Sequence, residues 1–120
     1  RHELARRYDA LLAGLPVITP WQHPDGYSGL HLYVIRLQLD KIQRSHLQVF
    51  ESMRAKDIIV NLHYIPVHTQ PHYKKLGLKE GDFPVAEAYY REAISIPMYP
   101  KLTEAQQDEV VAALKESMGL

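Results

Sequence analysis

The sequence predicts an α/β or α+β sandwich in which a small sheet of about three strands is covered by helices. Segments with helical periodicity alternate along the chain with short segments rich in β-branched and aromatic residues. The chain has 120 residues, of which 46% are hydrophobic and 23% are charged, as is usual for a globular domain. This length fits a single domain with its own hydrophobic core.

The N-terminal third is predicted to form a helix, a loop and a strand. Apolar residues recur on one helical face over residues 2–14, and Gly14 and the proline after Leu15 mark the end of that helix. Residues 16–29 contain several prolines and glycines and are predicted to form a loop. Residues 31–39 are rich in aromatic and β-branched side chains, so we place this strand centrally in the sheet.

The middle of the chain is predicted to form a helix, a strand and a long irregular segment. Asp40, with Gln43 three residues later, resembles a capping box and predicts a helix through about residue 55. Residues 58–64 are largely apolar and are predicted to form a second strand that ends before a proline. Residues 65–82 show no periodicity and are predicted to be irregular.

The C-terminal third is predicted to form two helices separated by a strand. Asp82 is placed as the N-cap of a helix over residues 83–92. A short strand over residues 93–98 follows and is closed by proline. Thr103 and Gln106 form a capping-box pattern that starts the last helix.

Composition excludes several classes of protein and site. Lys and Arg total 14 and so do Asp and Glu, so an electrostatic grip on nucleic acid or on an anionic membrane is not indicated. The absence of cysteine excludes disulfides, thiol nucleophiles and thiolate metal sites. No apolar run approaches the ~20 residues of a membrane span and no secretory signal is recognisable, so we expect a cytoplasmic protein.

Imidazole and phenol side chains are concentrated in one short segment. Its members are His63, Tyr64, His68, His72 and Tyr73. Such groups can cap a sheet edge and satisfy one another's hydrogen bonds, or they can form a functional site on a loop that follows a strand. Composition alone leaves both interpretations open.

A metal site is not predicted in this segment. His68 and His72 have the spacing of a helical ligand pair, but Pro66 and Pro71 interrupt that helix and no acidic residue is close in sequence. Elsewhere, Tyr89 and its neighbour fit packing better than a site. Tyr99 is either a packing anchor or the wall of a cleft.

The residues alone indicate no complete active site. No side chain is an obvious nucleophile, and the lysines all lie among polar neighbours rather than in an apolar setting that would lower a lysine pKa. No glycine-rich loop joins a strand to a helix, so a Rossmann turn or a P-loop is not supported. The chain therefore looks like a globular domain with one loop rich in His and Tyr.

Four ordered motifs have a recognisable pattern. The central one covers residues 61–73, with the sequence NLHYIPVHTQPHY. The others cover residues 31–37, 81–87 and 96–103, and the helix around Tyr8 precedes them all. Together they resemble the DegT/StrS family, which consists of pyridoxal-phosphate sugar aminotransferases of fold type I. The resemblance spans nearly the whole chain.

The resemblance implies a place for the chain in a larger enzyme. Residues 1–120 would be the C-terminal small domain, with a connector helix over 1–15 and a sandwich with a mostly antiparallel sheet over 16–120. The family keeps its Schiff-base lysine and most phosphate ligands in an N-terminal large domain, which is absent from this chain. The chain would then hold no catalytic or cofactor-binding residue and be inactive alone. The full enzyme would be a homodimer that uses pyridoxal 5'-phosphate.

The central motif looks closest to a subgroup that acts in pseudaminic acid biosynthesis. This subgroup transfers an amino group from glutamate to C4 of a UDP-linked 4-keto-6-deoxy-N-acetyl sugar. By motif position, the resemblance implies substrate contacts at His68, His72 and Tyr73, and secondarily at His63 and Tyr64. A related subgroup has Tyr in place of His72.

Two other interpretations remain open from the sequence. A stand-alone small binding module would explain the compact length and the lack of a nucleophile. Against it, the chain opens with Arg1 inside a helical pattern rather than with Met, as expected of a piece of a longer protein. A sugar dehydratase of the same family, with histidine in place of the lysine, would differ only in the missing domain.

Overall fold

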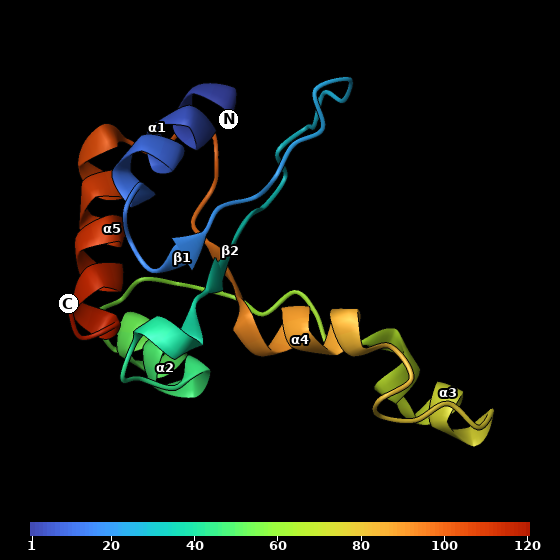
Figure 1. Cartoon of the computed structure of the whole chain (residues 1–120). Helices are drawn as coiled ribbons and strands as arrows, with labels where there is room; N and C mark the ends of the chain where they lie inside the picture. The colour runs from blue at the N-terminus through green and yellow to red at the C-terminus, as the bar shows by residue number, and fades with distance from the viewer.

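The computed structural model describes all 120 residues and contains a three-stranded antiparallel sheet (Figure 1). The strand order is β1 (Val17–Ile18), β2 (Tyr33–Leu37) and β3 (Ala93–Ile96), so β2 lies in the centre. Alternate residues of β2 are buried, whereas every residue of β3 is buried. The predicted fold class, a small sheet covered by helices, is confirmed.

Three of the five helices cover the sheet. Figure 1 shows α1 (His2–Leu12) beside α5 (Glu104–Ser117), and α2 (His46–Ala55) near the C-terminal end of α5. A cluster of 19 buried apolar residues joins these helices to the sheet and forms the core. None of the helices combines the length and apolar character needed to cross a membrane.

The remaining two helices form a projecting lobe. Figure 1 shows α3 (Pro71–Lys75) and α4 (Pro84–Glu92) extending away from the body, with α3 farthest from α5. Helix α4 runs directly into β3, because Glu92 ends the helix and Ala93 begins the strand. The lobe is therefore connected to the central sheet through the junction of α4 and β3. The segment with the predicted site residues, 63–73, follows α2 in the chain and enters the lobe, where its last residues belong to α3.

The predicted cap of α5 is confirmed and that of α2 is wrong. Thr103 and Gln106 form a reciprocal capping box at the start of α5. Helix α2, in contrast, begins at His46, where Ser45 and Gln48 form the capping box. Asp40 lies in a 3-10 turn, η1 (Leu39–Lys41), and extended backbone after that turn prevents it from continuing into a helix.

The predicted strand over residues 58–64 is largely wrong. Only Asn61 pairs with β3, through two backbone hydrogen bonds with Ser95 that form an isolated bridge. The third strand is instead β1, which falls in the segment predicted to be a loop and pairs with the end of β2. A two-residue strand between prolines has too little periodicity to be recognised, and its pairing depends on a partner about 20 positions away.

Part of the segment predicted to be irregular is helical. Residues 65–82 contain a 3-10 turn, η2 (Val67–Thr69), and the short helix α3, in which Pro71 occupies the first turn. Asp82 does not cap α4, contrary to prediction. Its carboxylate instead accepts hydrogen bonds from the backbone N–H and the ammonium group of Lys79. Helix α4 therefore begins without a side-chain cap.

Candidate functional site

A groove of about 720 Å³ lies between the start of the 63–73 segment and helix α4. One wall is formed by residues 63–67 and the other by residues 82–86 together with Tyr89. Its apolar and aromatic side chains are exposed. They include Tyr64, Ile65, Val67, Phe83, Val85 and Tyr89. An open apolar groove with a few polar groups is typical of a binding site rather than of a folded core.

His63 lines the groove and is anchored to the sheet. Its Nδ1 lies 2.7 Å from the hydroxyl oxygen of Ser95, a buried residue of β3. This hydrogen bond fixes the plane of the imidazole ring. Tyr64, the next residue, is 64% exposed and lines the same groove. The structure thus brings two of the five predicted site residues together.

His68 is buried rather than open to the groove. Only 5% of the residue is exposed, and its Nε2 lies 2.6 Å from the Oε1 atom of Glu87 on α4. The ring of Phe83 covers the imidazole at a centroid distance of 4.8 Å. His68 therefore joins the η2 turn to α4 from within the lobe.

The carboxylate of Glu87 accepts hydrogen bonds from two parts of the lobe. Its Oε1 accepts hydrogen bonds from His68 and also from the backbone N–H of Gly81, which lies 2.7 Å away. The hydrogen bond from His68, then that from Gly81, and also the charge of Arg91, hold the pKa of the Glu87 carboxyl below its ordinary value. The carboxylate is thus favoured in its ionised form.

His72 and Tyr73 lie on α3, away from the residues that line the groove. Both are exposed, and their rings meet edge to face at a centroid distance of 5.2 Å. They share the lobe with His68 but are not among the residues that line the groove. The structure therefore places the five predicted residues in three settings: the groove, the lobe interior and the surface of α3.

No three His, Asp or Glu side chains converge in a way that could hold a metal ion. Although His68 and His72 are four residues apart, they belong to different elements, η2 and α3. The Nε2 of His68 is already held by Glu87.

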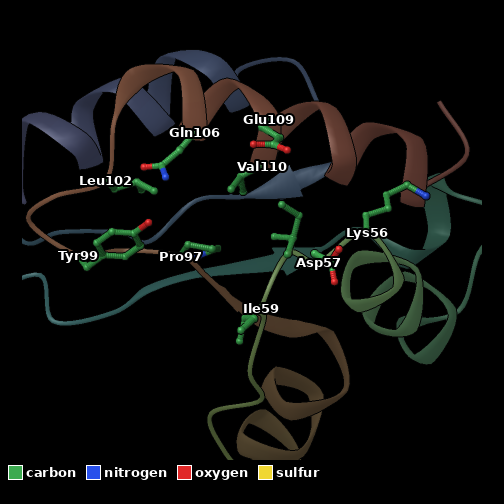
Figure 2. A pocket seen from close by; sticks show the side chains of 10 residues that line it. Lys56, Asp57, Ile59, Pro97, Tyr99, Leu102, Gln106, Glu109 and Val110 are labelled. Carbon is green, nitrogen blue, oxygen red and sulfur yellow. The ribbon is translucent and has the colours of Figure 1, made fainter.

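A second hollow, of about 420 Å³, lies between residues 56–59, which follow α2, the segment after β3, and helix α5 (Figure 2). Leu102 and Val110 contribute apolar surface, and Lys56, Asp57 and Glu109 contribute charge. Tyr99, for which the sequence left two interpretations, lines this hollow. None of the five predicted site residues belongs to it.

Sequence reasoning missed several residues of the groove. Glu87 and Phe83 lie within the 81–87 motif, but nothing in that motif shows that they contact His68. The sequence pattern indicates Ser95 only as part of a strand. It favours packing for Tyr89, whereas Tyr89 lines the groove. His68 and Glu87 are 19 positions apart, so no local pattern connects them.

The groups that line the groove are suited to binding a ligand by hydrogen bonds and stacking. Imidazole and phenol groups offer hydrogen-bond donors and acceptors, and the exposed rings offer faces for stacking. The residues that line it include no lysine, cysteine or serine. This chemistry suits a polar ligand that carries a flat ring.

Comparisons with known proteins found a family model, curated relatives and solved structures that match the chain. Residues 1–115 match the model of the DegT/DnrJ/EryC1/StrS aminotransferase family. The chain is 35% identical over 119 residues to the spore coat polysaccharide biosynthesis protein SpsC of Bacillus subtilis, with 97% of this chain and 31% of SpsC covered. It is 36% identical over 118 residues to dTDP-3-amino-3,4,6-trideoxy-alpha-D-glucose transaminase of Streptomyces venezuelae, with 97% and 30% covered.

The fold also matches that of a solved structure. The chain superposes on S. venezuelae DesV, solved in complex with a ketimine intermediate, with a TM-score of 0.84 and 32% identity. The match covers 96% of this chain and 30% of DesV. The chain thus spans about 30% of the length of the relatives it matches.

Proposed function

The chain belongs to the DegT/DnrJ/EryC1/StrS aminotransferase family, and from this premise we propose that it is the C-terminal domain of a pyridoxal-phosphate sugar aminotransferase. In this proposal, residues 1–15 connect it to an N-terminal large domain, and the complete enzyme is a homodimer. The domain contributes one wall of the cleft that holds a nucleotide-linked sugar. The 120 residues alone are inactive.

The observation that carries this proposal is the position of the central motif. Its first residues, His63 and Tyr64, line a groove together with aromatic side chains of the later 81–87 motif. Two motifs that resemble those of a sugar-nucleotide enzyme therefore meet at one binding surface. Tyr64, Phe83 and Tyr89 offer ring faces for a uracil base, and His63 offers a polar edge for a hydroxyl or phosphate.

The residues of this chain do not fit a covalent site for the cofactor. Pyridoxal phosphate supplies the electron sink for amino transfer and is held by a lysine. No lysine lines the groove, and Lys74 and Lys75 are exposed on α3. We therefore assign no step of the transfer to this domain, and the proposal places the cofactor in the rest of the enzyme.

Within the complete enzyme, the five residues have separate roles. His63 and Tyr64 contact the substrate in the groove. His72 and Tyr73, exposed on α3, contact it from the tip of the lobe once the remaining domain faces them. His68 contributes from its buried position by shaping the segment that carries the other four.

The substrate we propose is a UDP-linked 4-keto-6-deoxy-N-acetyl sugar, which receives its amino group at C4 from glutamate. The wording of the central motif, NLHYIPVHTQPHY over residues 61–73, supports this choice. This motif resembles that of the pseudaminic acid subgroup.

The test is to express the full-length gene product and supply pyridoxal phosphate, glutamate and the UDP-4-keto sugar. We expect a UDP-4-amino sugar, identified by its mass, and 2-oxoglutarate in equal amount. A lysine-bound cofactor absorbs near the visible edge. Loss of the sugar hydroxyl without amino transfer, together with no such absorbance, would assign the protein to the dehydratases of this family. Absence of both reactions and of a cofactor domain would overturn the proposal.

A further inference from the structure

One oxygen of Glu87 joins two segments of the lobe. Its Oε1 lies 2.6 Å from Nε2 of His68 and 2.7 Å from the backbone nitrogen of Gly81. His68 belongs to the η2 turn, and Gly81 belongs to the loop that precedes α4. Both short distances are typical of hydrogen bonds to a charged acceptor.

Water has little access to this contact. The side chain of Glu87 is 12% exposed and that of His68 is 6% exposed. The ring of Phe83 packs on the imidazole. If the carboxylate were removed, the Nε2 atom would lose its only protein partner at a site that solvent reaches poorly. An unsatisfied buried polar group is costly, so the η2 turn would be expected to move.

The segment has a second anchor on the same structural unit. His63 is held by Ser95 of β3, and His68 is held by Glu87 of α4. Because α4 continues directly into β3, both anchors lie on one continuous element. Residues 63–68 are thus fixed at both ends against a single rigid support. The groove is the space between this segment and that support.

We propose that Glu87 is a positioning residue for substrate binding, which acts through His68 to hold the 63–73 segment against α4. Glu87 does not contact the substrate. It sets the width of the groove and the place from which α3 presents His72 and Tyr73. This inference rests on the proposed function, because the ligand whose binding it adjusts is the nucleotide-linked sugar.

The test uses the full-length enzyme with the variants Glu87→Ala and Glu87→Gln. Glutamine keeps an acceptor oxygen for Gly81 and His68 but loses the charge, so it is the conservative variant. Glu80→Ala is the matched control, because Glu80 is an exposed carboxylate on the same loop. The measurements are KM and kcat for the UDP-4-keto sugar and amide hydrogen exchange over residues 66–76.

We expect Glu87→Ala to raise KM for the sugar roughly tenfold or more and to change kcat less than about threefold, because it weakens binding in ground and transition states alike. Exchange over 66–76 should accelerate in the same variant. Glu87→Gln should restore most of both properties, and Glu80→Ala should match the unmodified enzyme. In a His68→Asn background, Glu87→Ala should raise KM much less than it does in the unmodified enzyme, since Glu87 acts through His68.

Other outcomes separate the two proposals. Wild-type KM and wild-type exchange in folded Glu87→Ala overturn the positioning role. If that variant does not fold, wild-type KM and wild-type exchange in His68→Asn overturn it instead, because His68→Asn removes the same contact. An enzyme that does not act on the sugar, but whose 66–76 exchange accelerates in Glu87→Ala, overturns the proposed function and supports the anchoring of the segment by Glu87.

Discussion

The imidazole of His63 and the hydroxyl of Ser95 form a hydrogen bond of 2.7 Å between residues 32 positions apart. Ser95 also pairs with Asn61 through its backbone. The same residue of β3 therefore holds the start of the groove wall by both its main chain and its side chain. Because of this double attachment, the sheet fixes the orientation of His63.

Replacing Ser95 with alanine should release His63 without removing the strand pairing. We expect unfolding of the chain to become easier by about 1 kcal/mol, the usual net value of one hydrogen bond. Ser117→Ala is the matched control, because Ser117 is also buried and bonds Ser52 at 2.9 Å, outside the groove. Urea unfolding measures the stability, and the imidazole nitrogen shifts of His63 report its release. Equal His63 shifts in both variants would contradict the anchor.

The two candidate caps of α2 should differ in their effect on stability. Ser45→Ala removes the hydroxyl that accepts from the backbone N–H of Gln48, so we expect a loss of about 1 kcal/mol. Asp40→Ala removes an exposed carboxylate from the η1 turn and should change stability by less than about 0.5 kcal/mol. Thermal unfolding of the two variants compares them directly. A larger loss in Asp40→Ala would show that the helix begins earlier than in this structure.

Substitutions in the central strand β2 and in residues 58–64 should differ in their effect on stability. Ile35 is fully buried in β2, so Ile35→Ala should cost about 2–5 kcal/mol by leaving a cavity. Ile59 lies in the segment predicted as a strand but is largely exposed. Ile59→Ala should therefore change stability by less than about 0.5 kcal/mol. A loss in Ile59→Ala as large as that in Ile35→Ala would mean that residues 58–64 form a complete buried strand.

Glu87 should make the stability of the chain depend on acidity. Because the pKa of its carboxyl is lowered on folding by the hydrogen bond from His68, its contribution is present above the ordinary value of 4.5. That contribution is lost as the pH falls through the lower folded pKa. The stability difference between the wild type and Glu87→Gln should thus be largest near neutral pH and shrink in acid. Urea unfolding at a series of pH values tests this.

The control for this prediction is Glu80→Gln, whose stability should run parallel to the wild type at every pH. Some acid sensitivity should remain in Glu87→Gln, because hydrogen bonds from Lys79 also lower the pKa of the Asp82 carboxyl. A difference that grows toward acid pH would show that Glu87 is protonated in the folded chain.

The two hollows can be told apart by one pair of variants in the full-length enzyme. Tyr64 is 64% exposed in the groove, and Tyr99 is 43% exposed in the second hollow. Tyr64→Ala should raise KM for the nucleotide-linked sugar about tenfold, the loss expected when a base loses a stacking partner. Tyr99→Ala should leave KM within about twofold. Steady-state kinetics measures KM for both variants. If Tyr99→Ala raised KM and Tyr64→Ala did not, the substrate site would lie in the hollow shown in Figure 2.

Local patterns were predictable wherever neighbours in sequence decide the structure. The capping box of Thr103 and Gln106 depends on atoms three residues apart, and it occurs as predicted. The end of α1 follows from Gly14, which adopts a φ of +79°. The start of α2 was not predictable in this way, because Asp40 and Ser45 are both residue types that cap helices. The extended backbone between them makes Ser45 the cap.

The sequence by itself determined the family, the class of fold, the central strand and the segment in which imidazole and phenol groups gather, because these depend on residue identity and on periodicity. Only the tertiary structure decided which groups meet. The pairs His63–Ser95 and His68–Glu87 are separated by 32 and 19 positions. Their contact depends on how α4 joins β3 and how the chain turns at η2, and no local periodicity encodes those paths.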